Sequence, residues 1–316
     1  VCGSLAPFHE LEATLAAFKK TGAALTFSTG YAAALGTITA LVGKGDIIIL
    51  DKLVHACIVD AAHLSGAKIR VFAHNDGNVL EVIVLVAIVN KSAIGNRQSA
   101  ILVITESIFS MDGDAAPLRE IVALKNKFGA WLMVDEAHAT GILGQNGRGL
   151  ADELGVSEQI EIQMGTLGKA LGASGGYICG SRAMIDYLVN RARSFIFSTA
   201  PVPAAAAAAN AAIQIAQSIE GEQRRRQRRQ RIDVVKSALR TPHSAFSSAI
   251  IPLILGDESK ALAAATALRE QGIFVPAIRY PTVARGAARL RITLTAAHSL
   301  ADVSTLAGAL SQFDNQ

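Results

Sequence analysis

The chain has 316 residues, of which 51% are hydrophobic and 18% are charged, and its formal net charge is +4. This balance excludes an intrinsically disordered protein, because such chains have few hydrophobic residues and a high net charge. The longest apolar run, Val82 to Val89, is far shorter than the roughly 20 residues that span a bilayer, so it predicts a buried strand or helix and no membrane partner. At this length we expect two domains.

Six arginines between Arg224 and Arg231 account for the basic charge. No aromatic residues are interleaved with them, as base stacking would require, so we expect a solvated helix face and no nucleic-acid partner. Cys2, Cys57 and Cys179 are too few and too widely spaced for a disulfide framework or a zinc site. No secretory signal is recognisable at the start, and the expected compartment is the cytoplasm.

Helices and short strands alternate through the first two thirds of the chain. Residues 10–20 predict an amphipathic helix, and residues 24–31 predict a strand that runs into a small-residue turn before a helix over 32–42. Further strands are predicted at 47–50, 69–72, 101–105, 132–134, 160–163 and 176–179, with helices between most of them. This alternation predicts an α/β fold with a mainly parallel central sheet and helices on both faces.

A long Ala-rich helix is predicted over residues 204–219, directly after Pro203, and we expect it to bridge two domains. The remaining segments predict a smaller α+β domain; they are 250–255, 261–271, 290–294 and 300–313. We therefore expect a large domain over residues 1–215 and a small C-terminal domain over residues 216–316.

Asp135 and Lys169 form the ordered pair that most strongly indicates chemistry. Lys169 lies among small residues in Gly-Thr-Leu-Gly-Lys-Ala-Leu-Gly, so an aldehyde can approach its amine and form a Schiff base. Asp135, in the upstream segment Val-Asp-Glu-Ala-His, can keep a pyridinium nitrogen protonated and make the ring an electron sink. Either residue alone is more often structural or solvated, but the combination predicts a pyridoxal phosphate (PLP) enzyme.

Two further segments are candidates for cofactor contacts. Thr29, Gly30 and Tyr31 open a helix, whose free N–H groups and dipole favour a bound phosphate, although an ordinary turn glycine fits the same sequence. His55 follows a predicted strand and is either an ordinary half-buried histidine or a ring that stacks on a planar cofactor.

The polar run Glu106 to Pro117 belongs at the carboxyl edge of the sheet, where ligands bind in open α/β folds. Its Asp112-Gly-Asp114 lacks the spacing of a calcium loop, and His138 lacks a second histidine at metal spacing. We therefore expect no metal.

A serine hydrolase is a competing hypothesis. Gly172 to Gly176 (Gly-Ala-Ser-Gly-Gly) matches the nucleophile-elbow pattern, with His243 or His298 as the candidate base. The elbow should directly follow a strand, whereas the lysine segment intervenes here. Hydrolysis through Ser174 is therefore the weaker hypothesis.

At four segments, 110–114, 134–141, 165–169 and 290–298, the sequence resembles the α-oxoamine synthases. These are fold-type I PLP enzymes that join an amino acid to an acyl-CoA with loss of carboxylate. Segments 250–256 and 279–286 are most similar to the branch that condenses L-alanine with pimeloyl-CoA, or a pimeloyl carrier protein, in biotin biosynthesis. Alternatives are sister enzymes such as 2-amino-3-ketobutyrate CoA ligase or serine palmitoyltransferase, and a catalytically silent partner subunit.

The resemblance implies roles around the cofactor ring. Lys169 would form the Schiff base, Asp135 would pair with the pyridine nitrogen, and His55 would stack on the ring. Ser110 and His138 would hydrogen-bond near the ring's phenolic oxygen.

The resemblance also implies contacts farther from the ring nitrogen. Glu106 would support the ring's surroundings, and the phosphate contacts would come from Thr166 and the backbone of Gly30 and Tyr31. Arg291 would hold the amino-acid carboxylate, and Thr282 would line the acyl site.

The chain departs from the family at two places. Family members carry a further segment ahead of the residues that match Val1, so the chain looks truncated, and Leu80 to Ala100 replaces a shorter linker. In this family the active site lies at a dimer interface, so we expect a homodimer.

Overall fold

The structure is a computed structural model that describes residues 4–93, 99–239 and 248–313. Contacts divide the chain into two compact units. Unit 1 holds residues 1–108 and 116–218, and unit 2 holds residues 109–115 and 219–316. The domain boundary expected at residues 215/216 stays a prediction, and the short segment 109–115 groups with the C-terminal residues.

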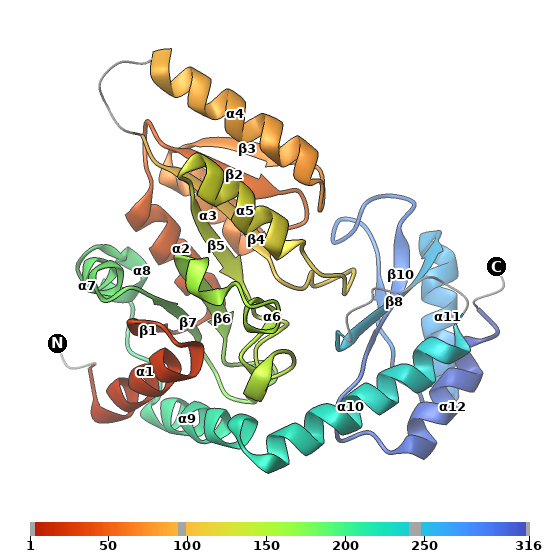
Figure 1. Cartoon of the computed structure of the whole chain (residues 1–316). Coiled ribbons are helices and arrows are strands. Elements are labelled where there is room, and N and C mark those ends of the chain that lie inside the picture. Colours follow the sequence, from red (N-terminus) through yellow and green to blue (C-terminus); the bar gives the residue numbers. More distant parts are fainter. Residues whose placement is uncertain (1–3, 94–98, 240–247, 314–316) are drawn as a thin grey trace. The chain divides into compact units, whose positions relative to one another are not determined.

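Unit 1 is built around a seven-stranded sheet in the order β1-β7-β6-β5-β4-β2-β3 (Figure 1). The strands are β1 (Ala23–Phe27), β2 (Ile47–Asp51), β3 (Lys68–Phe72), β4 (Ile101–Glu106), β5 (Trp131–Asp135), β6 (Ile162–Thr166) and β7 (Gly176–Gly180). Strands β3, β2, β4, β5 and β6 run parallel, whereas β7 is antiparallel to both β6 and β1. The prediction of a mainly parallel α/β sheet is confirmed.

Helices cover both faces of this sheet, as predicted. They are α1 (Ala6–Lys19), α2 (Gly30–Leu41), α3 (Ala56–Ser65), α4 (Gly77–Ala93), α5 (Leu118–Phe128), α6 (Leu150–Glu153), α7 (Arg182–Arg191), α8 (Arg193–Ile196) and α9 (Pro203–Gln217), with two 3-10 turns, η1 (Gln145–Gly147) and η2 (Ser157–Gln159). Side chains alternate between the faces of a strand. Ile178 of β7 therefore packs in the core with α2 and α3, while its neighbours Tyr177 and Cys179 pack with α1 and α9.

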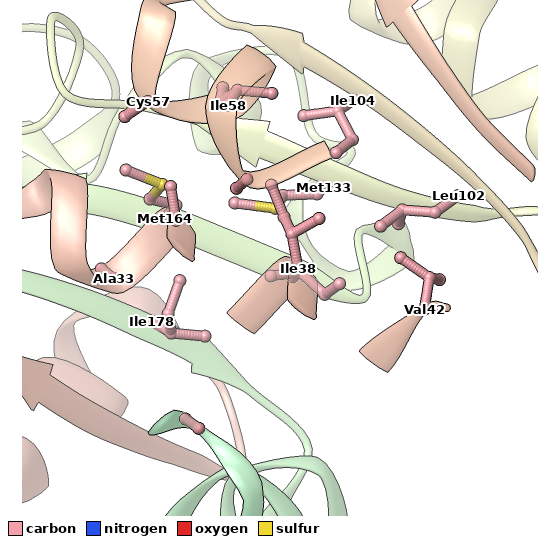
Figure 2. Packing of buried hydrophobic residues seen from close by; sticks show 14 of the residues in the cluster. Ala33, Ile38, Val42, Cys57, Ile58, Leu102, Ile104, Met133, Met164 and Ile178 are labelled. Carbon is pink, nitrogen blue, oxygen red and sulfur yellow. The ribbon is translucent and has the colours of Figure 1, made fainter. Parts of the chain in front are cut away.

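The core beneath α2 and α3 fixes where these helices begin. Figure 2 shows Ile38 of α2 and Ile58 of α3 beside Ile104, Met133 and Met164 of the sheet. All five side chains are at most 2% exposed. Because close-packed interiors leave little room for movement, the amino ends of both helices are held at fixed positions relative to the strands.

Three expectations in unit 1 need correction. The strand expected at 160–163 runs from Ile162 to Thr166, because β7 pairs with β6 as far as Gly176 opposite Thr166. The Ala-rich helix expected over 204–219 ends at Gln217. The apolar run Val82 to Val89 belongs to helix α4, but Val82, Leu85 and Val86 are exposed, so the expectation of a buried element is wrong for that face.

Unit 2 consists of a three-stranded antiparallel sheet in the order β8-β10-β9 with three helices. Its elements are α10 (Ile219–Ala238), β8 (Ile250–Gly256), α11 (Glu258–Glu270), β9 (Ala277–Ile278), β10 (Ala288–Thr293) and α12 (Leu300–Leu310). Its core includes Ile232 of α10, Leu253 of β8 and Leu290 of β10.

The arginine run lies on α10 and is not the fully solvated face that we expect from its charge. Arg225 and Arg228 are 4% and 3% exposed, and they lie on the same buried stripe as Ile232 and Val235. Arg225 is paired with Glu222 at 2.9 Å. No helix within the described residues has both the length and the apolar composition to cross a membrane.

Candidate active site

Three predicted site residues end neighbouring parallel strands. Glu106, Asp135 and Thr166 are the last residues of β4, β5 and β6, and the sheet register pairs Glu106 with Asp135. Because parallel strands end at the same edge, these side chains lie at the carboxyl edge where open α/β sheets bind ligands. Glu106 is 2% and Asp135 5% exposed, so two carboxyl groups sit side by side at low exposure.

Burial raises the pKa of the Asp135 carboxyl, and the charge of Glu136 acts in the same direction. The N–H of Ala137, which donates to Oδ1 at 2.9 Å, and the charges of Lys169 and His55 act against this increase. Lys169 and His55 are thus within electrostatic reach of Asp135. A cation placed at this carboxylate would lower its pKa, so the position suits a cationic group of a ligand.

His55 is the residue that caps α3, directly after β2 and its turn. Its Nδ1 accepts the backbone N–H of Cys57 at 3.2 Å and lies 3.1 Å from Cys57 Sγ. When Nδ1 accepts, a neutral imidazole carries its proton on Nε2. Burial raises the pKa of the Cys57 thiol to about 12, and the charges of Asp135 and Glu106 contribute, which places Cys57 at the same edge.

Lys169 lies in the loop between β6 and β7 and is exposed. The loop is closed by backbone hydrogen bonds from Gly172 to the Lys169 carbonyl at 3.0 Å and from Ala173 to the Leu167 carbonyl at 2.9 Å. An amine that is exposed on an ordered loop is accessible to an aldehyde, as the Schiff-base hypothesis requires.

The amino end of α2 approaches the ends of β6 and β7 closely. The hydroxyl of Thr29 accepts the N–H of Ala32 at 3.0 Å, and Gly30 and Tyr31 form the first turn, where N–H groups have no partner inside the helix. A Cβ on Gly176 would lie 2.6 Å from the Gly30 nitrogen, whereas a Cβ on Gly30 itself would make only ordinary contacts with Thr166. Gly176 is therefore the glycine that permits the close approach.

These residues fit PLP by their chemistry. An acid at the end of β5 suits the ring nitrogen, an exposed lysine suits the aldehyde, and the first turn of α2 with the Thr166 hydroxyl suits a phosphate. The side-chain hydroxyl of Tyr31 donates to Asp60 Oδ2 at 2.6 Å, so only the backbone of this residue suits such a contact. His138 is half-buried in the turn that directly follows Asp135 and Glu136.

Three predicted residues belong to unit 2. Ser110 and Arg291 meet there, because Arg291 Nε donates to the Ser110 carbonyl at 2.7 Å and its guanidinium also donates to Thr293 Oγ1 at 3.0 Å. Thr282 lies in the exposed turn that follows β9. Arg289, which is 5% exposed, pairs with Asp112 in the same unit.

The sequence reasoning missed Cys57 and the buried Lys19–Glu136 ion pair. Cys57 could have been found from its position two residues after His55, on the inner face of the same helix. The ion pair carries no local signal, because its partners lie 117 residues apart.

The hydrolase hypothesis lacks its structural context. Ser174 is exposed in the loop before β7, and a strand follows it, whereas a nucleophile elbow leads from a strand into a helix. His243 lies outside the described residues, and His298 lies in unit 2. Among the residues that the structure describes, no group of three or more His, Cys, Asp or Glu side chains is placed to hold a metal ion.

A cavity of about 370 Å³ in unit 1 lies away from these residues, at the amino end of β5, where Trp131, Glu158 and Ser181 line it. Glu106, Asp135 and Thr166 lie at the opposite, carboxyl edge of the sheet, so this cavity is not part of the candidate site.

The fold and this edge define a PLP-type transferase site, and the sequence comparison agrees: the aminotransferase class I and II family matches residues 2–310. The chain belongs to this family. It is 45% identical to the 8-amino-7-oxononanoate synthase of Geotalea daltonii (98% of this chain, 78% of the relative) and 48% identical to that of Anaeromyxobacter dehalogenans strain 2CP-1 (98% and 76%).

Solved structures give the same result. Serine palmitoyltransferase from S. paucimobilis with a bound PLP-myriocin aldimine superposes with a TM-score of 0.90 at 31% identity, covering 99% of this chain and 77% of that one. The 8-amino-7-oxononanoate synthase of Francisella tularensis superposes with a TM-score of 0.82 at 28% identity, covering 99% and 88%. The predicted resemblance to the α-oxoamine synthases is confirmed.

Proposed function

We propose that the chain condenses L-alanine with pimeloyl-CoA, or with a pimeloyl carrier protein, to give 8-amino-7-oxononanoate, CO2 and CoA or the free carrier. The observation that carries this function is the agreement of several 8-amino-7-oxononanoate synthases, at 43–48% identity over nearly the whole chain. The reaction is a decarboxylative acyl transfer in biotin biosynthesis.

The cofactor is PLP, which supplies an electron sink for the negative charge that develops on the alanine α-carbon. Asp135 would hold the proton on the ring nitrogen, because a carboxylate at low exposure stabilises a neighbouring cation. Lys169 would attach the cofactor and then, as a free amine, accept the α-proton. His55, whose Nδ1 caps α3, would cover one face of the cofactor.

Ser110, His138 and Glu106 would hold the polar groups of the ring, and Gly30, Tyr31 and Thr166 would hold its phosphate. Arg291 would bind the alanine carboxylate. Its two internal hydrogen bonds use two of five N–H donors, so the guanidinium has donors for a bidentate contact. Thr282 would line the acyl site.

A sister synthase is the second candidate, because serine palmitoyltransferase gives the TM-score of 0.90. Sequence identity favours the alanine enzyme, at 48% against 31%. A non-catalytic subunit is the least favoured reading, because Lys169 is present.

We also propose a cytoplasmic homodimer. Ile196, Phe197 and Val202 are exposed apolar side chains close together in the sequence, and such side chains suit a subunit interface. Cys57 and Cys179 are buried free thiols, which suits a reducing compartment.

Lys169→Ala tests the chemistry. With added PLP, the wild-type chain should develop a visible Schiff-base absorption band that shifts on addition of L-alanine but not of L-serine. The variant should lack the lysine-dependent band and lose at least about 1000-fold in product formation from pimeloyl-CoA. A folded wild type with no band contradicts the proposal, and a preference for L-serine with palmitoyl-CoA would replace it by the sister activity.

A further inference from the structure

A buried ion pair joins the end of α1 to the residue after Asp135. The side chains of Lys19 and Glu136 are each 1% exposed, and the ammonium donates to the Glu136 carboxylate and to the Arg148 carbonyl. Burial acts to lower the pKa of Lys19, but the charge and hydrogen bond of Glu136 and the nearby Tyr177 raise the pKa above its usual value. The ammonium therefore stays protonated inside unit 1.

The Glu136 carboxylate is held on its other side as well. Its Oε1 accepts the backbone N–H of Ala151 at 2.9 Å. Gly149 faces the same group: a Cβ there would lie 2.3 Å from Oε2, and the residue has a φ of +122°. The surrounding backbone thus leaves room for this carboxylate only because residue 149 has no side chain.

The backbone around Glu136 determines how Asp135 points. The N–H of Glu136 donates to the Met164 carbonyl at 2.8 Å, and the next N–H, that of Ala137, donates to Asp135 Oδ1 at 2.9 Å. Asp135 is fixed on its other side by Ser107, whose N–H donates to the Asp135 carbonyl at 2.8 Å. The Ala137 amide orients the Asp135 carboxylate, and the tethered Glu136 side chain fixes that amide.

We propose that Lys19 is a positioning residue, which through Glu136 holds the backbone of residues 135–137 and so orients the Asp135 carboxylate toward the cofactor's ring nitrogen. The proposal rests on the function proposed above. Without Lys19, Glu136 would be a buried carboxylate with no cation, which must take up a proton or turn toward solvent. Either response loosens the segment that carries Asp135.

A second lysine–glutamate ion pair that contacts the same strand, and whose glutamate side chain is 35% exposed, provides a control. Lys125 Nζ and Glu161 Oε1 form an ion pair at 2.6 Å, with the lysine side chain 7% exposed. The other oxygen of Glu161 accepts the N–H of Leu132 at 2.9 Å, at the amino end of β5. This pair anchors the same strand as the Lys19 pair does, but at the end opposite to Asp135.

The experiment compares the whole chain with Lys19→Met, Glu136→Gln and Lys125→Met. PLP titrations give the dissociation constant, and visible circular dichroism reports the setting of the bound cofactor. For Lys19→Met we expect a PLP dissociation constant at least tenfold larger than that of wild type and an altered visible circular dichroism signal. For Glu136→Gln we expect a smaller change in the same direction. Lys125→Met should lower the melting temperature and leave both PLP readouts within twofold of wild type.

Wild-type PLP readouts in a folded Lys19→Met variant overturn the proposal and assign the pair to stability alone. If Lys19→Met does not fold, Glu136→Gln decides, since its amide oxygen can still accept from Ala151 while its NH2 group replaces the oxygen that accepts from Lys19. Equal loss of PLP binding in Lys125→Met also overturns the proposal. A wild-type chain that folds but binds no PLP overturns the proposed function together with this inference, whereas normal wild-type binding with unchanged variants overturns this inference only.

Discussion

The buried carboxyl of Asp135 affects the stability of the folded chain. Burial raises the pKa of its carboxyl above 3.8, so the folded chain holds a proton at this group more tightly than the unfolded chain. Its contribution to stability is fully present below the unfolded pKa and is lost as the pH rises through the folded pKa. At neutral pH, which lies above the unfolded pKa, this group therefore opposes folding of the cofactor-free chain, and the proposed pairing with a protonated ring would relieve that cost.

Asp135→Asn should raise the free energy of unfolding of the cofactor-free chain at pH 7.5, because the amide keeps an acceptor for Ala137 and removes the carboxyl group whose pKa burial raises. The same change should weaken PLP binding. Asp51→Asn is the control: its carboxylate, also at a strand end and 1% exposed, accepts hydrogen bonds from Leu53, His74 and Asn75. Asp51→Asn should lower the free energy of unfolding by about 1–3 kcal/mol. Urea titrations measure both, and destabilisation by Asp135→Asn would contradict the argument.

At the scale of elements, the contact between α2 and β7 forms the proposed phosphate site. Gly176→Ala should lower the free energy of unfolding by about 1–3 kcal/mol, because its Cβ would meet the backbone of Gly30, which cannot rotate away. Gly30→Ala should change stability by less than about 1 kcal/mol, since its Cβ meets only side chains at 3.7 Å or more. Chemical denaturation of the two variants distinguishes them. Equal costs would show that the helix end is free to move.

Local patterns predict most of the strands and the order of Asp135 and Lys169, because alternation and small-residue loops act over a few residues. They do not predict that Gly176 faces Gly30, nor the Lys19–Glu136 pair, because both depend on contacts between distant segments. The arginine run shows the same limit: composition predicts a solvated helix, yet Arg225 and Arg228 of α10 are 4% and 3% exposed.

At the scale of the whole molecule, the proposed homodimer depends on apolar side chains that the single chain leaves exposed. Phe197, at 71% exposed, has Arg193 over its ring at 4.8 Å. Phe274 in unit 2 is 73% exposed and has Arg269 over its ring at 5.5 Å, which makes it a matched control. Phe197→Asp should weaken the dimer at least about tenfold, because a charge buried in an interface without a partner opposes association.

Phe274→Asp should leave the dimer unchanged. Sedimentation velocity over a range of protein concentrations measures both variants against wild type. A wild-type chain that stays monomeric at high concentration, or equal weakening by the two variants, would contradict an interface at Phe197. Because the two phenylalanines have nearly the same exposure and the same kind of cationic neighbour, a difference between the variants indicates a partner surface at Phe197.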